Sequence, residues 1–229
     1  MGAPERHPTS AGVDDAVGLG AEGVRLDREA PVERTWLDEG SWFDVTPSFV
    51  RGADTLYELL VESVPFTQRE VYRYDHWKPE PRLGWWFTPG TAPHSVLVDA
   101  HRTLQHRYGV RFDGAALALY RDGRDSIAPH RDRDLRWLDD TVIALLVLGE
   151  RRPFVVQPLD AHDGGGLELR PGHGDLLVMG GATQARWRHG VPKVDATIGG
   201  RISVQWRWTS RRGRMERGGS YSKPRHYGR

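Results

Sequence analysis

Hydrophobic periodicity changes once along this chain, and that change constrains the fold more than any other feature. Before residue 109, residues 52–64 and 93–108 carry apolar side chains at helical spacing. The later segments are short, apolar and separated in places by glycine-rich turns, and they cover residues 114–120, 141–148, 153–157, 166–170, 174–179 and 201–208. Helices followed by many short strands predict an α+β fold, with the helices packed on an antiparallel sandwich or barrel.

Charge is distributed unevenly over the 229 residues, although the whole chain carries a formal charge of only +1. Residues 1–40 contain nine acidic and four basic side chains, whereas residues 211–229 contain seven basic side chains and one acidic one. The length suits one domain with extended ends, so we expect a flexible acidic leader and a disordered basic tail. The tail could hold a polyanion or could be solvated without a partner, and both readings stay open.

The sequence contains no cysteine, which excludes disulfides, a thiolate nucleophile and a cysteine-ligated metal. Its first residues do not resemble a signal peptide, and no apolar run reaches the length that spans a membrane. We therefore expect a cytoplasmic protein, monomeric and without a membrane partner.

Two His-x-Asp pairs are candidates for metal ligands. In an extended segment, His130 and Asp132 point to the same face, and so do His173 and Asp175. Either pair alone occurs more often in a surface turn than at a metal. His189 offers a third ligand, and two histidines with one carboxylate on one face of Fe(II) leave coordination positions open.

The last predicted strand, residues 201–208, has two contrasting faces. Alternation places Ile202, Val204, Trp206 and Trp208 on the apolar face, and Arg201, Ser203, Gln205 and Arg207 on the polar face. If buried, the two guanidinium groups need anions, and a dicarboxylate would supply them. The alternative is a solvated polar face, the more common fate of such a strand.

These motifs together resemble the AlkB-type family of Fe(II)/2-oxoglutarate-dependent dioxygenases. The similar segments occur in the same order and spacing, including twelve residues from His189 to Arg201, and they are residues 120–134, 148–154, 174–179, 181–193 and 201–207. The resemblance covers residues 36–210, which leaves residues 1–35 as the leader and 211–229 as the tail.

The resemblance implies a double-stranded β-helix (jelly-roll) core with helices packed on one sheet. It implies that His130, Asp132 and His189 hold the catalytic Fe(II), with 2-oxoglutarate and O2 as cosubstrates. It assigns the binding of 2-oxoglutarate to Tyr120, Arg201, Ser203 and Arg207. The pair of His173 and Asp175 falls where the family has a turn, so we expect a structural role for it.

The family oxidises N-alkyl groups on nucleobases, so the resemblance also implies a repair-type dealkylation of DNA or RNA. Asp134 matches the acidic residue that reads the damaged base, and Arg82 lies in a stretch similar to the nucleotide-recognition region. Either Trp85 or Trp86 could stack on a base, or both could belong to the core. Arg152 could contact the substrate or cap a strand end.

Two departures from the family pattern concern the cosubstrate. Ala118 stands where the family usually has asparagine, and Ser203 and Gln205 replace the asparagine and threonine of the last strand. They leave room for an oxygenase that acts on a protein or a small molecule. A nucleic-acid binder without catalysis is a third hypothesis, which the intact set of His130, Asp132, His189 and Arg201 argues against.

Overall fold

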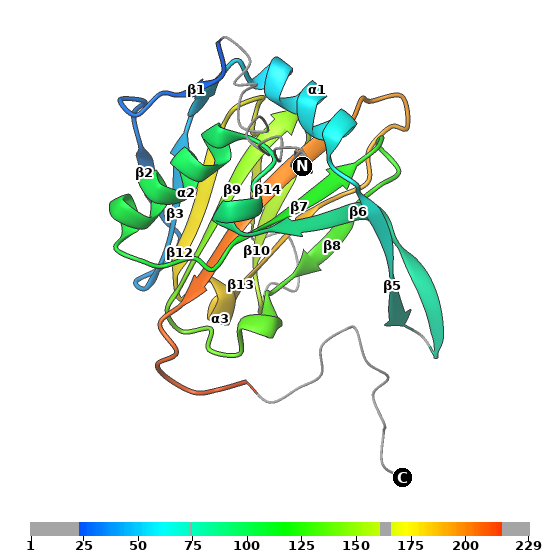
Figure 1. Ribbon diagram of the computed structural model, residues 1–229. Helices are drawn as coiled ribbons and strands as arrows, with labels where there is room; N and C mark the ends of the chain where they lie inside the picture. The colour runs from blue at the N-terminus through cyan, green and yellow to red at the C-terminus, as the bar shows by residue number, and fades with distance from the viewer. Residues whose placement is uncertain (1–22, 74, 161–165, 217–229) are drawn as a thin grey trace, which may run out of the picture.

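The computed structural model describes residues 23–73, 75–160 and 166–216. Two antiparallel sheets form its centre (Figure 1). The larger sheet has the order β2-β3-β12-β9-β14-β7-β6-β5, and the smaller one has the order β11-β10-β13-β8. The strands of the larger sheet are β2 Glu33–Trp36, β3 Ser41–Thr46, β5 Thr67–Arg73, β6 His76–Phe87, β7 Ala115–Tyr120, β9 Thr141–Gly149, β12 Leu176–Gly181 and β14 Arg201–Thr209.

The smaller sheet contains β8 Ile127–His130, β10 Phe154–Pro158, β11 Leu167–Leu169 and β13 Trp187–Val191. Its inner face packs on the larger sheet through one apolar cluster, in which Phe154 and Val156 of β10 meet residues such as Ile143 and Leu145 of β9. This arrangement is the expected jelly-roll core. A separate pair of short strands, β1 Arg25–Leu26 and β4 Val50–Arg51, lies beside it.

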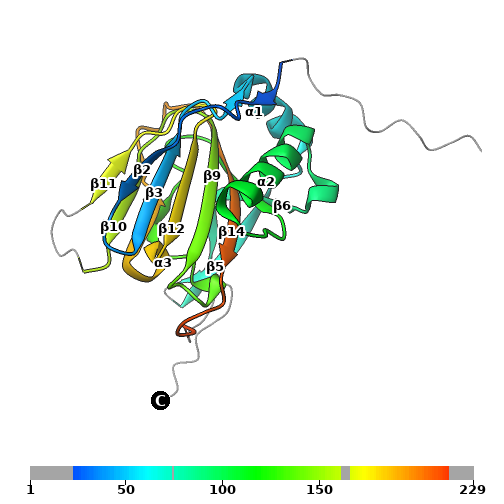
Figure 2. The same cartoon turned by 90° about the vertical axis from the view of Figure 1, so that its left-hand side faces the viewer.

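The two predicted helices are confirmed as α1 Ala53–Ser63 and α2 Ser95–Tyr108. Both cover the outer face of the larger sheet, as Figure 2 shows. Their buried leucines pack against Val204 and Trp206, so the apolar face of β14 meets the helices as expected. Helix α2 ends at Gly109, whose φ of 64° lies in the left-handed region that glycine adopts without a Cβ clash. None of the described helices is long and apolar enough to cross a membrane.

The N-terminal half contains strands that the sequence pattern did not predict. Strands β5 and β6 are rich in charged residues and β6 includes two prolines, so neither shows the apolar alternation of a typical strand. Residues 25–26 and 33–35 of the expected leader also lie in strands, whereas residues 1–22 fall outside the described residues.

The expected tail is likewise described in part. Residues 211–216 continue from β14, and Met215 forms a β-bridge with Trp137 rather than belonging to a disordered segment. Residues 217–229 fall outside the described residues.

Candidate metal and cosubstrate site

Three candidate ligands converge where the smaller sheet meets the end of β14. His130 ends β8, Asp132 follows it, and His189 in β13 is the cross-strand partner of His130. The two imidazole centroids lie 4.5 Å apart, and one ligand atom from each of the three residues lies within 4.8 Å of the others. Within the described parts of the chain, no other group of acidic and histidine side chains is arranged in this way.

The decoy pair of His173 and Asp175 has a structural environment instead. His173 accepts a hydrogen bond from the Gly149 amide and lies 2.7 Å from Asp54 on α1. The Asp175 carboxylate accepts hydrogen bonds from backbone amides, including that of Ser48 at 2.9 Å. The expectation that this pair supports a turn agrees with these contacts.

The protonation states of the three candidate ligands suit a divalent cation. His130 Nδ1 lies 3.0 Å from the Ala128 carbonyl, which can only accept a hydrogen bond, so Nδ1 is the donor and Nε2 is the ring nitrogen that faces Asp132, at 3.4 Å. Burial, together with the neighbouring His130 and Arg207, lowers the pKa of His189 to about 3, against the opposing effect of Asp132. Burial alone would raise the pKa of Asp132, but Arg207 and the two imidazoles outweigh it and lower that pKa. The site therefore offers two imidazoles, of which that of His189 is neutral, and one ionised carboxylate, which fits a metal.

Gln184 of α3 Thr183–Arg186 supports this loop, and the sequence analysis did not find it. Its side-chain oxygen accepts a hydrogen bond of 2.9 Å from the Asp132 amide. Gln184 is itself buried, so the contact fixes the backbone that carries the candidate carboxylate ligand. No local pattern announces such a contact, because it joins residues 52 positions apart.

Arg201 provides the second half of the site. Its side chain is fully buried on β14 opposite Tyr120, and none of its three guanidinium nitrogens has a hydrogen-bond partner among the residues that the structure describes. Burial, together with the neighbouring Arg152, lowers its pKa to about 10, against the opposing effect of Tyr120. A buried cation without an anion is costly, so this orphaned guanidinium fits the distal carboxylate of a bound dicarboxylic acid.

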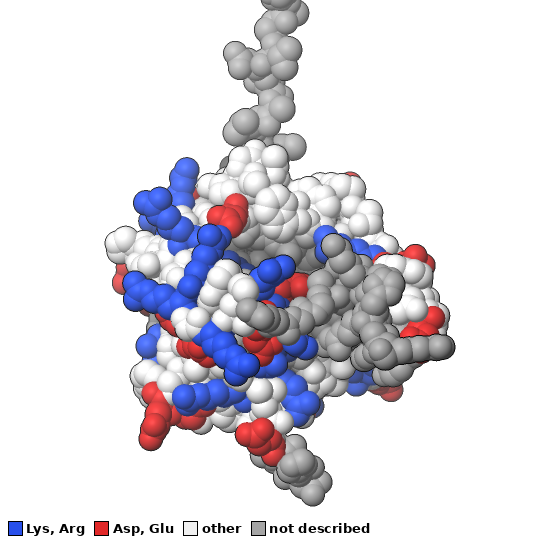
Figure 3. All heavy atoms as spheres, turned by 90° about the horizontal axis from the view of Figure 1, so that it is seen from below, with Lys and Arg blue, Asp and Glu red and all other residues white. Residues whose placement is uncertain are grey.

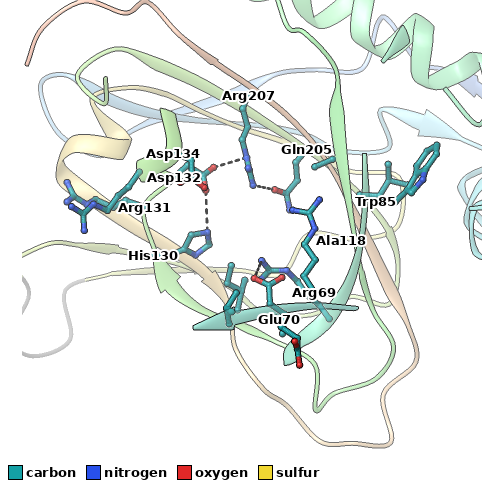
Figure 4. A pocket seen from close by; sticks show the side chains of 18 residues that line it. Arg69, Glu70, Trp85, Ala118, His130, Arg131, Asp132, Asp134, Gln205 and Arg207 are labelled. Carbon is teal, nitrogen blue, oxygen red and sulfur yellow. Dashed lines mark hydrogen bonds and ion pairs between the residues drawn. The ribbon is translucent and has the colours of Figure 1, made fainter. Parts of the chain in front are cut away.

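A cavity of about 270 Å³ opens beside the candidate metal ligands (Figure 4). Strands β5, β6, β7, β8 and β14 all contribute to its wall. His130, Asp132 and Arg207 lie on one side of it, and the hairpin of β5 and β6 lies on the other. A buried metal site thus has direct access to a polar pocket of molecular size.

Comparison with known proteins agrees with this geometry. Residues 54–215 match the family model of the 2OG-Fe(II) oxygenase superfamily. The chain belongs to that superfamily. It is therefore a 2-oxoglutarate-dependent dioxygenase, an enzyme that uses Fe(II) with 2-oxoglutarate and O2 as cosubstrates.

The oxygenase is similar to curated AlkB-type relatives. It is 31% identical over 204 residues to alpha-ketoglutarate-dependent dioxygenase alkB homolog 3 of Rattus norvegicus, covering 80% of this chain and 69% of the relative. It is 25% identical over 208 residues to DNA oxidative demethylase ALKBH2 of Mus musculus, covering 81% and 87%. These relatives place the oxygenase in the AlkB-like group, as the motifs implied.

Solved structures support the fold of the oxygenase. OsALKBH1 superposes with a TM-score of 0.53 at 14% identity, over 76% of this chain and all of that one. A prolyl hydroxylase from Trichoplax adhaerens in complex with a peptide gives a TM-score of 0.55 at 13% identity, over 72% and 83%. At such identities the likeness concerns the jelly-roll architecture alone.

The two departures from the AlkB pattern are neighbours in this oxygenase. Ala118 on β7 is the cross-strand partner of Ser203 on β14, two pairs beyond Tyr120 and Arg201 and on the same face of the sheet. Both are buried, and Ala118 lines the cavity. Two positions that are distant in the sequence therefore change the same small part of the site.

The residues of the oxygenase that were predicted to bind the substrate differ in their position relative to the cavity. Asp134 and Arg82 line the cavity, and Trp86 is 51% exposed. Trp86 pairs with Ala116 and so lies on the same face of β6 as Gly84, but it is not itself among the described residues that line the cavity. Trp85 is among the residues that line the cavity, although its ring points away from the cavity centre and stacks on Phe87 with centroids 6.0 Å apart.

Arg152 is also corrected by the structure. It is fully buried beneath the Tyr120 ring, and its guanidinium donates hydrogen bonds to the carbonyls of Asp122, Asp125 and Pro192 at 2.8 to 3.0 Å. It cannot reach a nucleic acid. Instead it joins the segment before His130 to the segment after His189.

Several charged cavity residues were not predicted from the sequence, among them two on β5. Arg69 and Glu70 of β5 line the cavity on the side of the hairpin. The only available signal was their place in a charged stretch just before the aromatic segment, which did not show the apolar alternation of a strand. Together with Asp134 and Arg82 they give the cavity groups of both charges.

Proposed function

We propose that this oxygenase removes N-alkyl groups, in particular methyl groups, from the bases of DNA or RNA. The observation that carries the proposal is the position of the candidate iron ligands at the side of a cavity with acidic and basic groups around it. The similarity to alkB homolog 3 and to the proteins named DNA oxidative demethylase supports the same substrate class.

In this proposal His130, Asp132 and His189 bind Fe(II), and the arginines of β14 bind 2-oxoglutarate. Arg201 pairs with the distal carboxylate, with Tyr120 and Ser203 beside it. Arg207 holds Asp132 in its ionised form and lies near the metal-side carboxylate. When bound, the iron with 2-oxoglutarate and O2 supplies the oxidant that converts a C–H bond of the alkyl group into C–OH.

After hydroxylation, the remaining steps of the dealkylation require only a proton transfer and a nucleobase that is held in the cavity. The hydroxyl group loses its proton and becomes the carbonyl of an aldehyde, while the C–N bond breaks and its electron pair returns to the ring nitrogen. The alkylated base must leave its stack to reach the metal. Asp134 and Arg82, which line the cavity, would hydrogen-bond its edge, and Trp86, on the same face of β6 as Gly84, would offer it an aromatic face.

Mass spectrometry of a panel of methylated oligonucleotides tests this proposal. Single- and double-stranded DNA and RNA carrying 1-methyladenine or 3-methylcytosine are incubated with enzyme, Fe(II) and 2-oxoglutarate. We expect loss of 14 mass units from at least one lesion together with succinate formation, and neither with His130→Ala. If no lesion loses its methyl group while 2-oxoglutarate is still consumed, the substrate is instead a protein side chain or a small molecule.

The domain limits at residues 35/36 and 210/211, a monomeric state and a cytoplasmic location belong to the same proposal. Size-exclusion chromatography with light scattering of the full chain tests the oligomeric state. A mass near 25.9 kDa is expected.

A further inference from the structure

Two arginines that flank the candidate ligand Asp132 share one carboxylate. Arg131 places a guanidinium nitrogen 2.9 Å from one Glu216 oxygen, and Arg133 places its Nε 2.8 Å from the other. The three side chains are between 19% and 30% exposed. They are thus partly desolvated, yet a ligand can reach them from solvent.

The backbone delivers Glu216 to this position. The Glu216 amide donates to the Arg136 carbonyl at 2.7 Å, and Met215 bridges Trp137. The segment after β14 therefore runs antiparallel along the loop that follows the metal-ligand segment, at the bottom of Figure 1. These backbone contacts hold Glu216 against Arg131 and Arg133.

The shared carboxylate lies between two hollows. Arg131 and Arg133 line the cavity of the candidate metal site, and they also line a second hollow together with Glu216. Figure 4 shows Arg131 directed away from the cavity centre. Figure 3 shows that basic side chains cover much of the lower face, with acidic ones among them. A nucleic-acid strand that enters the metal cavity from this face would meet Arg131 and Arg133.

We propose that Arg131 and Arg133 form a binding site for a phosphodiester group of the nucleic-acid substrate, which Glu216 occupies until the substrate displaces it. Guanidinium groups bind carboxylate and phosphate in the same bidentate manner, so one anion can replace the other. This inference rests on the proposed function and adds to it a competing anion within the chain. Glu216 lowers affinity, because two ion pairs must break before the phosphate binds.

Fluorescence anisotropy with a dye-labelled, unmodified single-stranded DNA measures this competition in the full chain. Glu216→Gln removes the competing charge and should lower Kd about three- to tenfold, which corresponds to about 0.6–1.4 kcal/mol. Glu168→Gln is the matched control, because Glu168 forms a similar ion pair with Arg170 at 2.9 Å on β11. It changes the net charge equally and should leave Kd unchanged.

A double-mutant comparison separates the shared site from a general charge effect. Arg131→Gln with Arg133→Gln should weaken binding and reduce the salt slope by roughly 0.7 per arginine lost. In that background, adding Glu216→Gln should have no effect. A gain in affinity that persists without the arginines would overturn the site, and so would equal behaviour of Glu216→Gln and Glu168→Gln.

The behaviour of the wild type distinguishes failure of the phosphodiester site from failure of the proposed function. If the wild type binds DNA and removes methyl groups while Glu216→Gln matches Glu168→Gln, the phosphodiester site alone is wrong. If the wild type binds neither DNA nor RNA and removes no methyl group from either of them, the proposed function and the phosphodiester site are both wrong.

Discussion

Arg207 Nε lies 2.9 Å from Asp132 Oδ2, so an ion pair joins the far end of β14 to the segment that carries the candidate carboxylate ligand. Figure 4 shows Arg207 also donating to the Gln205 side-chain oxygen, at 2.6 Å. This contact connects the two sheets at the site, because β14 belongs to the larger sheet and Asp132 follows a strand of the smaller one. It also keeps the carboxylate ionised before a metal arrives.

Replacing Arg207 by glutamine should therefore weaken metal binding and raise KM for 2-oxoglutarate, each by about 10- to 100-fold, as for other losses of a partner around a metal ligand. Isothermal titration with Fe(II) under anaerobic conditions and succinate assays measure the two effects. Arg102→Gln on the exposed side of α2 is a control with the same charge change. An unchanged KM in Arg207→Gln would mean that β14 does not hold the cosubstrate at this end.

Co(II) absorption titrations test the candidate ligands against the decoy histidine. His130→Ala and His189→Ala should each lose tight Co(II) binding and all succinate formation, since each removes one of three protein ligands. His173→Ala should keep both properties, because His173 contacts Gly149 and Asp54 rather than the site. Loss of Co(II) binding in His173→Ala, with the fold intact by circular dichroism, would contradict this assignment.

Substitution of Arg201 should not lower the thermal stability of the free protein, but it should abolish the stabilisation by 2-oxoglutarate. Arg201→Met removes a buried guanidinium that has no partner, so the free protein should be as stable as wild type or more stable. 2-Oxoglutarate should raise the melting temperature of the wild type but not of Arg201→Met. Thermal unfolding with and without 2-oxoglutarate measures this, with succinate as the control ligand. Equal stabilisation of both proteins by 2-oxoglutarate would place the distal carboxylate elsewhere.

Sequence alone predicted the parts of the site that depend on local alternation. The spacing of His130 and Asp132 and the two faces of β14 follow from a period of two, which any strand obeys. The meeting of His189 with His130 depends on the pairing of β13 with β8, two short strands without a strong apolar pattern. The resemblance to a family, and no local pattern, therefore carried that part of the prediction.

Residues whose roles depend on register or burial could not be assigned in advance. Adjacent tryptophans point to opposite faces of a strand, and only the pairing of β6 with β7 decides that Trp86 lies on the same face as Gly84 and Ala116. Arg152 follows a strand and would ordinarily be solvated. Its burial follows from three backbone carbonyls that distant segments place around it.

Arg152 should consequently matter for stability. Arg152→Met removes the side-chain donor from the carbonyls of Asp125 and Pro192 and leaves the Asp122 carbonyl only the Asp125 amide, which should lower the free energy of unfolding by about 3 kcal/mol. Urea unfolding measures the loss. Arg124→Met is the comparison, because Arg124 is 78% exposed and pairs with Asp122 at the surface. A wild-type stability for Arg152→Met would show that these hydrogen bonds are dispensable.

Asp38 makes a pH-dependent contribution next to the candidate site. Its carboxylate accepts hydrogen bonds from Trp187 Nε1 at 2.7 Å and from Arg186 at 3.1 Å, and Trp187 begins the strand that contains His189. Burial acts to raise the pKa of Asp38, but these donors, with the Gly40 amide, outweigh it and lower the pKa to about 2. The ionised form is therefore favoured in the folded state.

Because the folded pKa lies below the unfolded value of 3.8, this stabilisation is present above pH 4 and is lost as the pH falls towards 2. Asp38→Asn should lower the free energy of unfolding by about 1 kcal/mol at pH 7, after allowance for partial exposure. Urea unfolding at pH 7 and at pH 2.5 should show that the difference from wild type shrinks in acid. Glu39→Gln, at the exposed neighbouring position, should show no difference at either pH. A difference for Asp38→Asn that is the same at both pH values would mean that the asparagine disturbs packing and that the charge of Asp38 contributes nothing.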